Sequence, residues 1–218
     1  MKDFLISTDV NIPDEDTRAY HHGDLRNALL TSALEILETD GLDAMSLRAV
    51  ARRAGVSQAA PYHHFKDKRA IMAAAATVGH IKLAEMAREF RDMGGKGYAS
   101  LIRMGAGYVA FAKDNPNLFR LMFGPELTDY TEDKEYQAST KLGLDMIIDR
   151  LAQLMNVDTE TGIDEIESSG LTSWCFVHGM ATLVVDNKIK CPETSEPAFL
   201  EFVFKMFATA YANGPATG

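Results

Sequence analysis

Several side chains between positions 46 and 68 are of types that bind DNA. Gln58 carries an amide that can pair with N6 and N7 of adenine in the major groove. Ala59 is short enough to allow a close approach or to touch a thymine methyl group. Ser57 would lie at a helix N-terminus, where backbone N–H groups favour a phosphate. These residues predict an interface with double-stranded DNA.

Hydrogen-bond donors and cations surround this stretch. Tyr62, His63 and Lys68 carry donors of the kind that hold phosphate groups. Arg48 and Arg53 would flank the site from the preceding helix. Other residues of the segment are expected to have structural roles. Phe65 is expected in the hydrophobic core, and His64 is expected to pack against neighbouring side chains. Arg52 could equally face solvent or contact DNA. Pro61 removes one backbone donor from the third helix.

Two short helices and a turn must position these side chains. Ser46 is a suitable N-cap for a helix over residues 47–53. Gly55 can adopt the positive φ of a tight stop, and Val56 would fill the space between the helices. Ser57 is expected to cap a third helix that ends near His64. This arrangement is a helix-turn-helix, whose second helix enters the major groove.

Helical periodicity dominates the rest of the chain and predicts an all-α fold with about nine helices. Residues 1–17 are polar and acidic and are expected to form a disordered arm. A DNA-binding domain over 18–74 is expected to precede a helical dimerisation and ligand domain over 75–218. The expected helices are 24–40, 47–53, 57–64, 68–93, 98–113, 133–155, 163–186 and 196–212, with a short turn-like segment at 115–123.

Residues 20–72 resemble the N-terminal DNA-binding domain of the tetracycline-repressor (TetR/AcrR) family. The likeness includes the Gly55-Val56-Ser57 turn and the sequence Tyr62-His63-His64-Phe65. It implies a bacterial, dimeric regulator that is usually a repressor. The positions that the resemblance assigns to phosphate are Ser46, Tyr62, His63 and Lys68, and those it assigns to bases are Gln58 and Ala59.

The last two expected helices are apolar on more than one face. A second copy of the same pair would cover the surplus apolar surface, which predicts a homodimer through these helices. Burial of both helices within one subunit is the alternative. Trp174 with His178-Gly179, together with Asn115-Pro116, resembles one C-terminal subgroup of the same family.

Aromatic and methionine side chains of the C-terminal part could line a site for a small apolar or amphipathic effector. A plain hydrophobic core, with Trp174 and His178 as a stacked pair, is the alternative. The candidate ligand-binding residues are Met104, Tyr108, Phe111, Phe119, Met146, Trp174 and His178.

Composition limits the other classes of function. The net charge is −9, but residues 18–72 carry eight basic and six acidic side chains, so the DNA-binding segment is net positive. No apolar run reaches the roughly 20 residues of a membrane span, and no signal peptide is recognised, so a cytoplasmic protein is expected. Cys175 and Cys191 form no disulfide framework, and the histidines lack zinc-type partners, so neither a metal nor a cofactor is expected.

The sequence thus predicts a repressor that a small ligand releases from a palindromic operator. A DNA-binding architectural or coregulatory protein without an effector, or one controlled by a protein antirepressor, would have the same sequence features. An enzyme using Cys175 and His178 is a third reading, disfavoured because no orienting acid or oxyanion motif accompanies them.

Overall fold

A computed structural model of the chain describes residues 22–93, 97–156, 163–189, 203–206 and 209. Every regular element within these ranges is helical, which confirms the all-α prediction. The predicted arm at 1–17 lies outside the described residues. Most of the predicted last helix, 196–212, also lies outside them, although 203–206 and 209 are helical.

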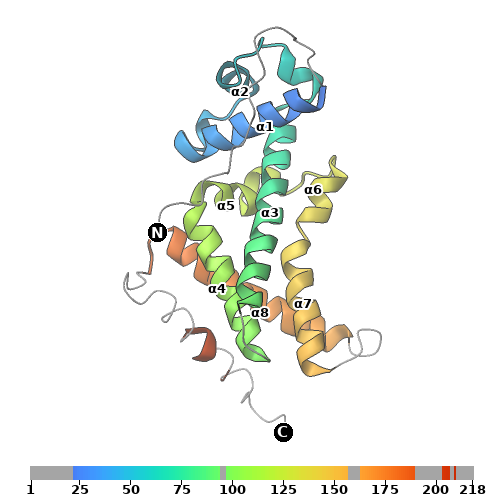
Figure 1. Cartoon of the computed structure of the whole chain (residues 1–218), viewed down its shortest axis with the longest axis vertical. Coiled ribbons are helices and arrows are strands. Elements are labelled where there is room, and N and C mark those ends of the chain that lie inside the picture. The colour runs from blue at the N-terminus through green and yellow to red at the C-terminus, as the bar shows by residue number, and fades with distance from the viewer. Residues whose placement is uncertain (1–21, 94–96, 157–162, 190–202, 207–208, 210–218) are drawn as a thin grey trace.

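The N-terminal helices form a small unit at one end of the molecule (Figure 1). It contains α1 (His22–Thr39), the 3-10 helix η1 (Leu42–Ala44), α2 (Leu47–Arg53) and the 3-10 helix η2 (Ala60–His63). Helix α1 buries side chains at helical spacing, among them Leu29, Ala33, Ile36 and Leu37. Its contacts with α2 and α3 hold the unit together.

Helix α3 (Lys68–Asp92) runs from this unit through the middle of the remaining helices (Figure 1). Asp67 caps it, because its carboxylate accepts from the Ala70 backbone N–H at 2.9 Å, and aspartate is among the residue types that N-caps favour. A run of small residues, 73–76, is fully enclosed and allows close packing. The helix is long and apolar enough to cross a membrane, but 67% of its most apolar window is buried inside the protein. It is therefore a core helix.

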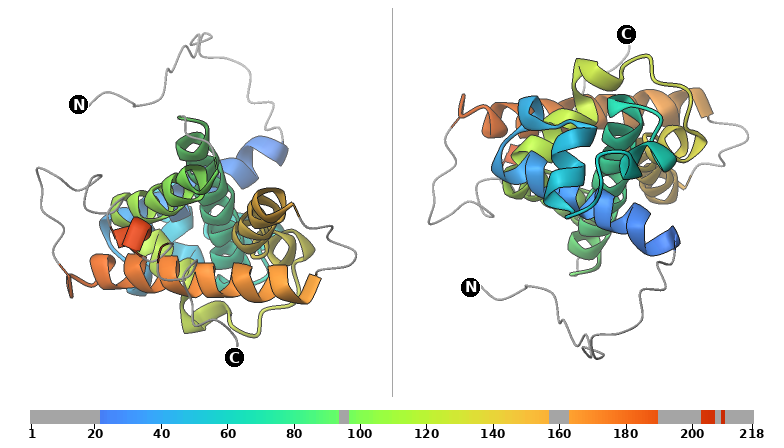
Figure 2. Two further views of the ribbon diagram at one scale, coloured as in Figure 1. Left: turned by 90° about the horizontal axis from the view of Figure 1, so that it is seen from below. Right: turned by 90° about the horizontal axis from the view of Figure 1, so that it is seen from above.

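Helices α4 (Tyr98–Asp114), α5 (Pro116–Phe123) and α7 (Leu142–Met155) pack against α3. Helix α8 (Ile163–Val185) packs across α4 and α7 (Figures 1 and 2). The prediction of a turn-like segment at 115–123 was wrong, because α5 is an α-helix. Pro116 occupies its first turn, where no backbone donor is missed, and the helix buries Leu118, Phe119, Leu121 and Met122.

The single helix predicted over 133–155 was also wrong. The structure divides it into α6 (Lys134–Ser139) and α7. The hydroxyls of Ser139 and Thr140 donate to the carbonyl oxygens of Tyr136 and Gln137, at 2.7 and 2.8 Å. Such short polar side chains compete with the backbone ladder, which accounts for the break at this point.

Candidate functional site

The helix-turn-helix segment folds largely as its residues predict. The Ser46 hydroxyl accepts from the Ala49 backbone N–H at 3.1 Å and so caps α2. Gly55 has a φ of 69°, the left-handed conformation expected of it. The Val56 N–H donates to the Ala51 carbonyl at 3.0 Å, and the Val56 side chain packs against the core.

The predicted recognition helix over 57–64 is shorter and tighter than expected. Ser57 caps no helix, and only Ala60–His63 forms a helical element, the 3-10 helix η2. Pro61 is buried and lacks the N–H that an α-helix would direct at the Ser57 carbonyl. The Ala60 N–H bonds to that carbonyl instead, at 3.0 Å, which is a 3-10 pattern.

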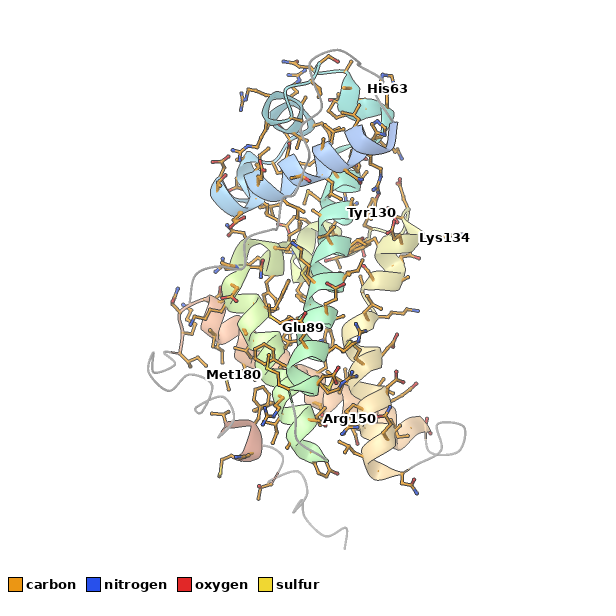
Figure 3. All side chains as sticks on the ribbon, in the orientation of Figure 1. His63, Glu89, Tyr130, Lys134, Arg150 and Met180 are labelled. Carbon is orange, nitrogen blue, oxygen red and sulfur yellow. The ribbon has the colours of Figure 1, made fainter. Side chains whose placement is uncertain are left out.

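The candidate DNA-contacting residues share an exposed surface at the end of the molecule. Ser57, Gln58, Ala59 and His63 are exposed, and Tyr62 is 56% exposed although it is aromatic. Figure 3 places His63 at the end opposite to Arg150 and Met180. Phe65 is buried in the core, as predicted, with the Arg26 guanidinium 5.5 Å from its ring.

The basic side chains near this surface differ in whether they form an ion pair or hydrogen bond within the protein. Arg48, Arg52 and Lys68 are exposed, and no hydrogen bond or ion pair joins their side chains to any residue that the structure describes. Arg53 instead pairs with Asp40 at 2.6 Å and donates to Thr39 at 3.3 Å. Arg53 thus fastens α2 to the end of α1, while the other three remain available to a phosphate.

The candidate ligand residues fall into two neighbouring groups. Met104, Tyr108 and Met146 line an apolar cavity of about 80 Å³ between α3, α4, α7 and α8. Phe119 and His178 line a second, larger hollow of about 410 Å³ against α5, which Leu42 also lines. Trp174 stands next to His178, with ring centroids 5.6 Å apart.

Phe111 is 1% exposed and lines neither hollow. Helix α3 also contributes to the cavity wall, through Leu83, Ala84 and Ala87, which were not among the predicted ligand residues. These three residues are one and three positions apart, so they share a helix face. This spacing could have indicated a ligand site, but it is equally typical of a helix buried in a protein core.

Tyr108 and His178 connect the two hollows. The Tyr108 hydroxyl lies 2.9 Å from His178 Nδ1, although 70 positions separate them. Burial raises the pKa of Tyr108, partly opposed by a hydrogen bond with Trp174, and burial lowers the pKa of His178. The imidazole tautomer determines which of the two groups donates, because the Tyr108 hydroxyl can act as donor or acceptor.

Another histidine, His80, is buried on α3 without a hydrogen-bond partner for Nε2 among the described residues. The rings of Phe123 and Tyr136 face it, with centroids 5.4 and 6.2 Å away. Burial lowers its pKa to about 4, so it is neutral at pH 7. Within the described ranges, no three His, Cys, Asp or Glu side chains form a group that could hold a metal ion.

Comparisons with known proteins agree with this geometry. Residues 29–75 match the family model of bacterial regulatory proteins of the tetR family, and residues 101–206 match that of the tetracyclin repressor-like C-terminal domain. Over 59 residues the chain is 42% identical to the class C tetracycline repressor of Escherichia coli. That alignment spans 25% of this chain and only 27% of the repressor.

Solved structures show the same fold along most of the chain. A Rhodococcus sp. RHA1 protein of unknown function is 26% identical, with a TM-score of 0.70, covering 88% of this chain and 98% of that one. A TetR-like transcriptional regulator, also from Rhodococcus sp. RHA1, is 15% identical, with a TM-score of 0.61, covering 94% and 100%. The subgroup suggested by Trp174 and His178-Gly179 stays a prediction.

Proposed function

Because this chain belongs to the TetR family of bacterial regulatory proteins, we propose that it is a homodimeric repressor that acts in the cytoplasm. It binds a palindromic operator and leaves it when a small molecule binds the C-terminal helices. The family is one of transcription regulators, and catalysis plays no part in this proposal.

One observation carries the DNA-binding part. The exposed side chains among residues 57–63 lie beside three cations, Arg48, Arg52 and Lys68, that no described residue neutralises. In the proposed complex Gln58 and Ala59 face base edges. Ser46, Arg48, Ser57, Tyr62, His63 and Lys68 hold phosphates.

Helix α8 supplies the proposed dimer contact, together with the last helix. It lies along one side of the bundle (Figure 2). Leu171 and Leu183 are 50% and 44% exposed on it, and Cys175 is also exposed. A twofold contact would cover these apolar side chains and fix the separation of the two DNA-binding units.

Contacts between the units support a mechanical release. The Asn117 amide on α5 donates to the carbonyl oxygens of Leu37 and Glu38 at the end of α1, at 3.0 and 3.4 Å. Arg120, one turn further, donates to the Val185 carbonyl and pairs with Asp186, both at 3.0 Å. A ligand that shifts α5 or α3 would therefore change the position of the DNA-binding unit.

The proposal is tested by selecting bound sequences from random duplex DNA with the purified protein. The expected result is a near-palindrome whose half-sites lie roughly 34–36 Å apart, or a multiple of it. Affinity for the selected site should fall steeply with salt, because phosphate contacts release counterions. Failure to enrich any sequence at low ionic strength would remove the proposal.

A further inference from the structure

The apolar cavity between α3, α4, α7 and α8 has no carboxyl, imidazole, ammonium or guanidinium group in its described lining. Two cations lie close to lining or neighbouring residues: Arg150 donates to Ser100 at 2.7 Å and to Gln153 at 3.0 Å, and the exposed Arg88 guanidinium lies 4.0 Å from the sulfur of Met146. A carboxylate or ammonium group entering the cavity would lose its hydration and gain no counter-charge from the residues that line it. Such desolvation costs several kcal/mol per ion.

Two of the three hydroxyl groups in the described lining already make hydrogen bonds within the protein. Tyr108 is hydrogen-bonded to His178, and the Ser173 hydroxyl donates to the Ser169 carbonyl at 2.9 Å. Tyr98, at 49% exposure, is the remaining hydroxyl of the described lining. A ligand inside the cavity therefore gains stability chiefly by burying apolar surface.

Two flexible side chains limit the size of that ligand. At about 80 Å³ the cavity is smaller than the roughly 150 Å³ that holds benzene in a dry protein interior. Met104 and Met146 line it, and methionine adapts its shape at low cost. Entry of a monocyclic molecule thus requires these side chains to move, which would transmit its presence to α4 and α7.

We propose that this cavity selects a small uncharged ligand, aromatic or largely hydrocarbon, and excludes carboxylates and organic cations of the same shape. The inference rests on the proposed function in one respect, namely that the ligand is the effector. The chemical class of the ligand follows from the lining alone.

Toluene, benzoate and benzylamine test the selectivity, because they share a ring and differ in charge at pH 7. Binding to the full chain is measured by calorimetry and by thermal shift. Toluene should raise the melting temperature with concentration. Benzoate and benzylamine should bind at least about 100-fold more weakly. Equal binding of either ion, or no binding by any of the three, overturns the inference.

Variants show whether binding occurs in this cavity. Ala84→Leu or Ala87→Leu fills it and should weaken toluene binding at least tenfold, whereas Ala138→Leu, at an exposed site on α6, should not. Unchanged binding in a folded filled variant contradicts the assignment. Far-ultraviolet circular dichroism identifies variants that have lost their fold, and in that case the comparison of the three probes still decides.

Retention of the selected operator is measured separately with each probe. Toluene that binds and also reduces retention supports both ideas. Toluene that binds without affecting retention supports the ligand class and contradicts ligand-driven release.

Discussion

Arg48 and Arg53 lie on the same short helix, α2, yet differ in what holds them. Arg53 is tied to Asp40 at 2.6 Å, while Arg48 has no partner among the described residues. An exposed ion pair of this kind contributes at most about 1 kcal/mol to stability, but it fixes where the guanidinium points. At the residue scale, a candidate DNA contact is a basic side chain that has no ion-pair partner and lies beside an exposed amide or hydroxyl. A basic side chain that is already paired, such as Arg53, has a structural role instead.

Gln58 and Lys68 should therefore affect DNA binding in different ways. Gln58→Ala should lower affinity for the selected operator by about 1–3 kcal/mol and leave binding to random DNA unchanged. Lys68→Ala should weaken both alike and reduce the salt slope by about one. Fluorescence anisotropy over a series of salt concentrations measures both effects. Identical behaviour of the two variants would contradict the division of roles.

His80 should make stability depend on pH. Its folded pKa of about 4 lies below the ordinary 6.5, so the unfolded chain binds more protons between these values. Its contribution is complete above pH 6.5 and is lost as the pH falls towards 4. When the pH falls from 7 to 5, protonation of His80 in the unfolded chain should lower the free energy of unfolding by about 2 kcal/mol. Urea titrations should show that His80→Leu removes this part of the loss, whereas His63→Leu, at an exposed site, does not.

At the scale of elements, two local features determine the shape of the DNA-binding unit. Gly55 turns the chain after α2 with a φ of 69°, and Pro61 confines the next segment to 3-10 geometry. Both act on the backbone rather than through side-chain contacts. The exposed surface from Ser57 to His63 is consequently a compact turn rather than a long helix.

Gly55→Ala tests the turn. A Cβ at this position would meet no atom within 4 Å, so the expected loss of about 1–2 kcal/mol comes from the left-handed backbone alone. Gly143→Ala is the matched control, because its Cβ is equally unobstructed but its φ is not positive. That substitution lies in α7 and should stabilise by about 0.5–1 kcal/mol. Thermal denaturation of the two variants should give shifts of opposite sign.

On the scale of the whole molecule, α3 and α5 join the DNA-binding unit to the larger helical part. Helix α3 contacts α1 at one end and α4 and α7 further along. Helix α5 holds α1 through Asn117 and the end of α8 through Arg120. Movement of α8 or of the cavity walls would therefore be transmitted to the surface that we propose meets DNA.

Leu183 tests the proposed dimer at this scale. Leu183→Glu places a charge on the outer side of α8 and should convert dimers to monomers, because burying an unpaired carboxylate is costly. Operator affinity should then fall at least about 100-fold, since each monomer reads only one half-site. Ile81→Glu, on α3 with 39% exposure, is the control and should remain dimeric. Sedimentation velocity that shows dimers for Leu183→Glu would contradict the assignment of the interface to α8.

The sequence alone determined the features that depend on neighbouring residues. The Asp67 and Ser46 caps, the positive φ of Gly55 and the apolar face of α1 follow from side chains a few positions apart, so periodicity and residue type were sufficient. The same reasoning identified the exposed side chains of Ser57, Gln58, Ala59, Tyr62 and His63. It expected an α-helix, however, where Pro61 produces a 3-10 turn.

Only the tertiary structure decided which distant residues meet. The Tyr108–His178 hydrogen bond, the Arg53–Asp40 pair and the α3 wall of the cavity join segments far apart in the chain. An apolar stripe in the sequence indicates that one face of a helix is buried, but it does not indicate which other helix packs against that face. That choice depends on how side-chain volumes fit together in three dimensions, and the order of residues along one helix does not contain it.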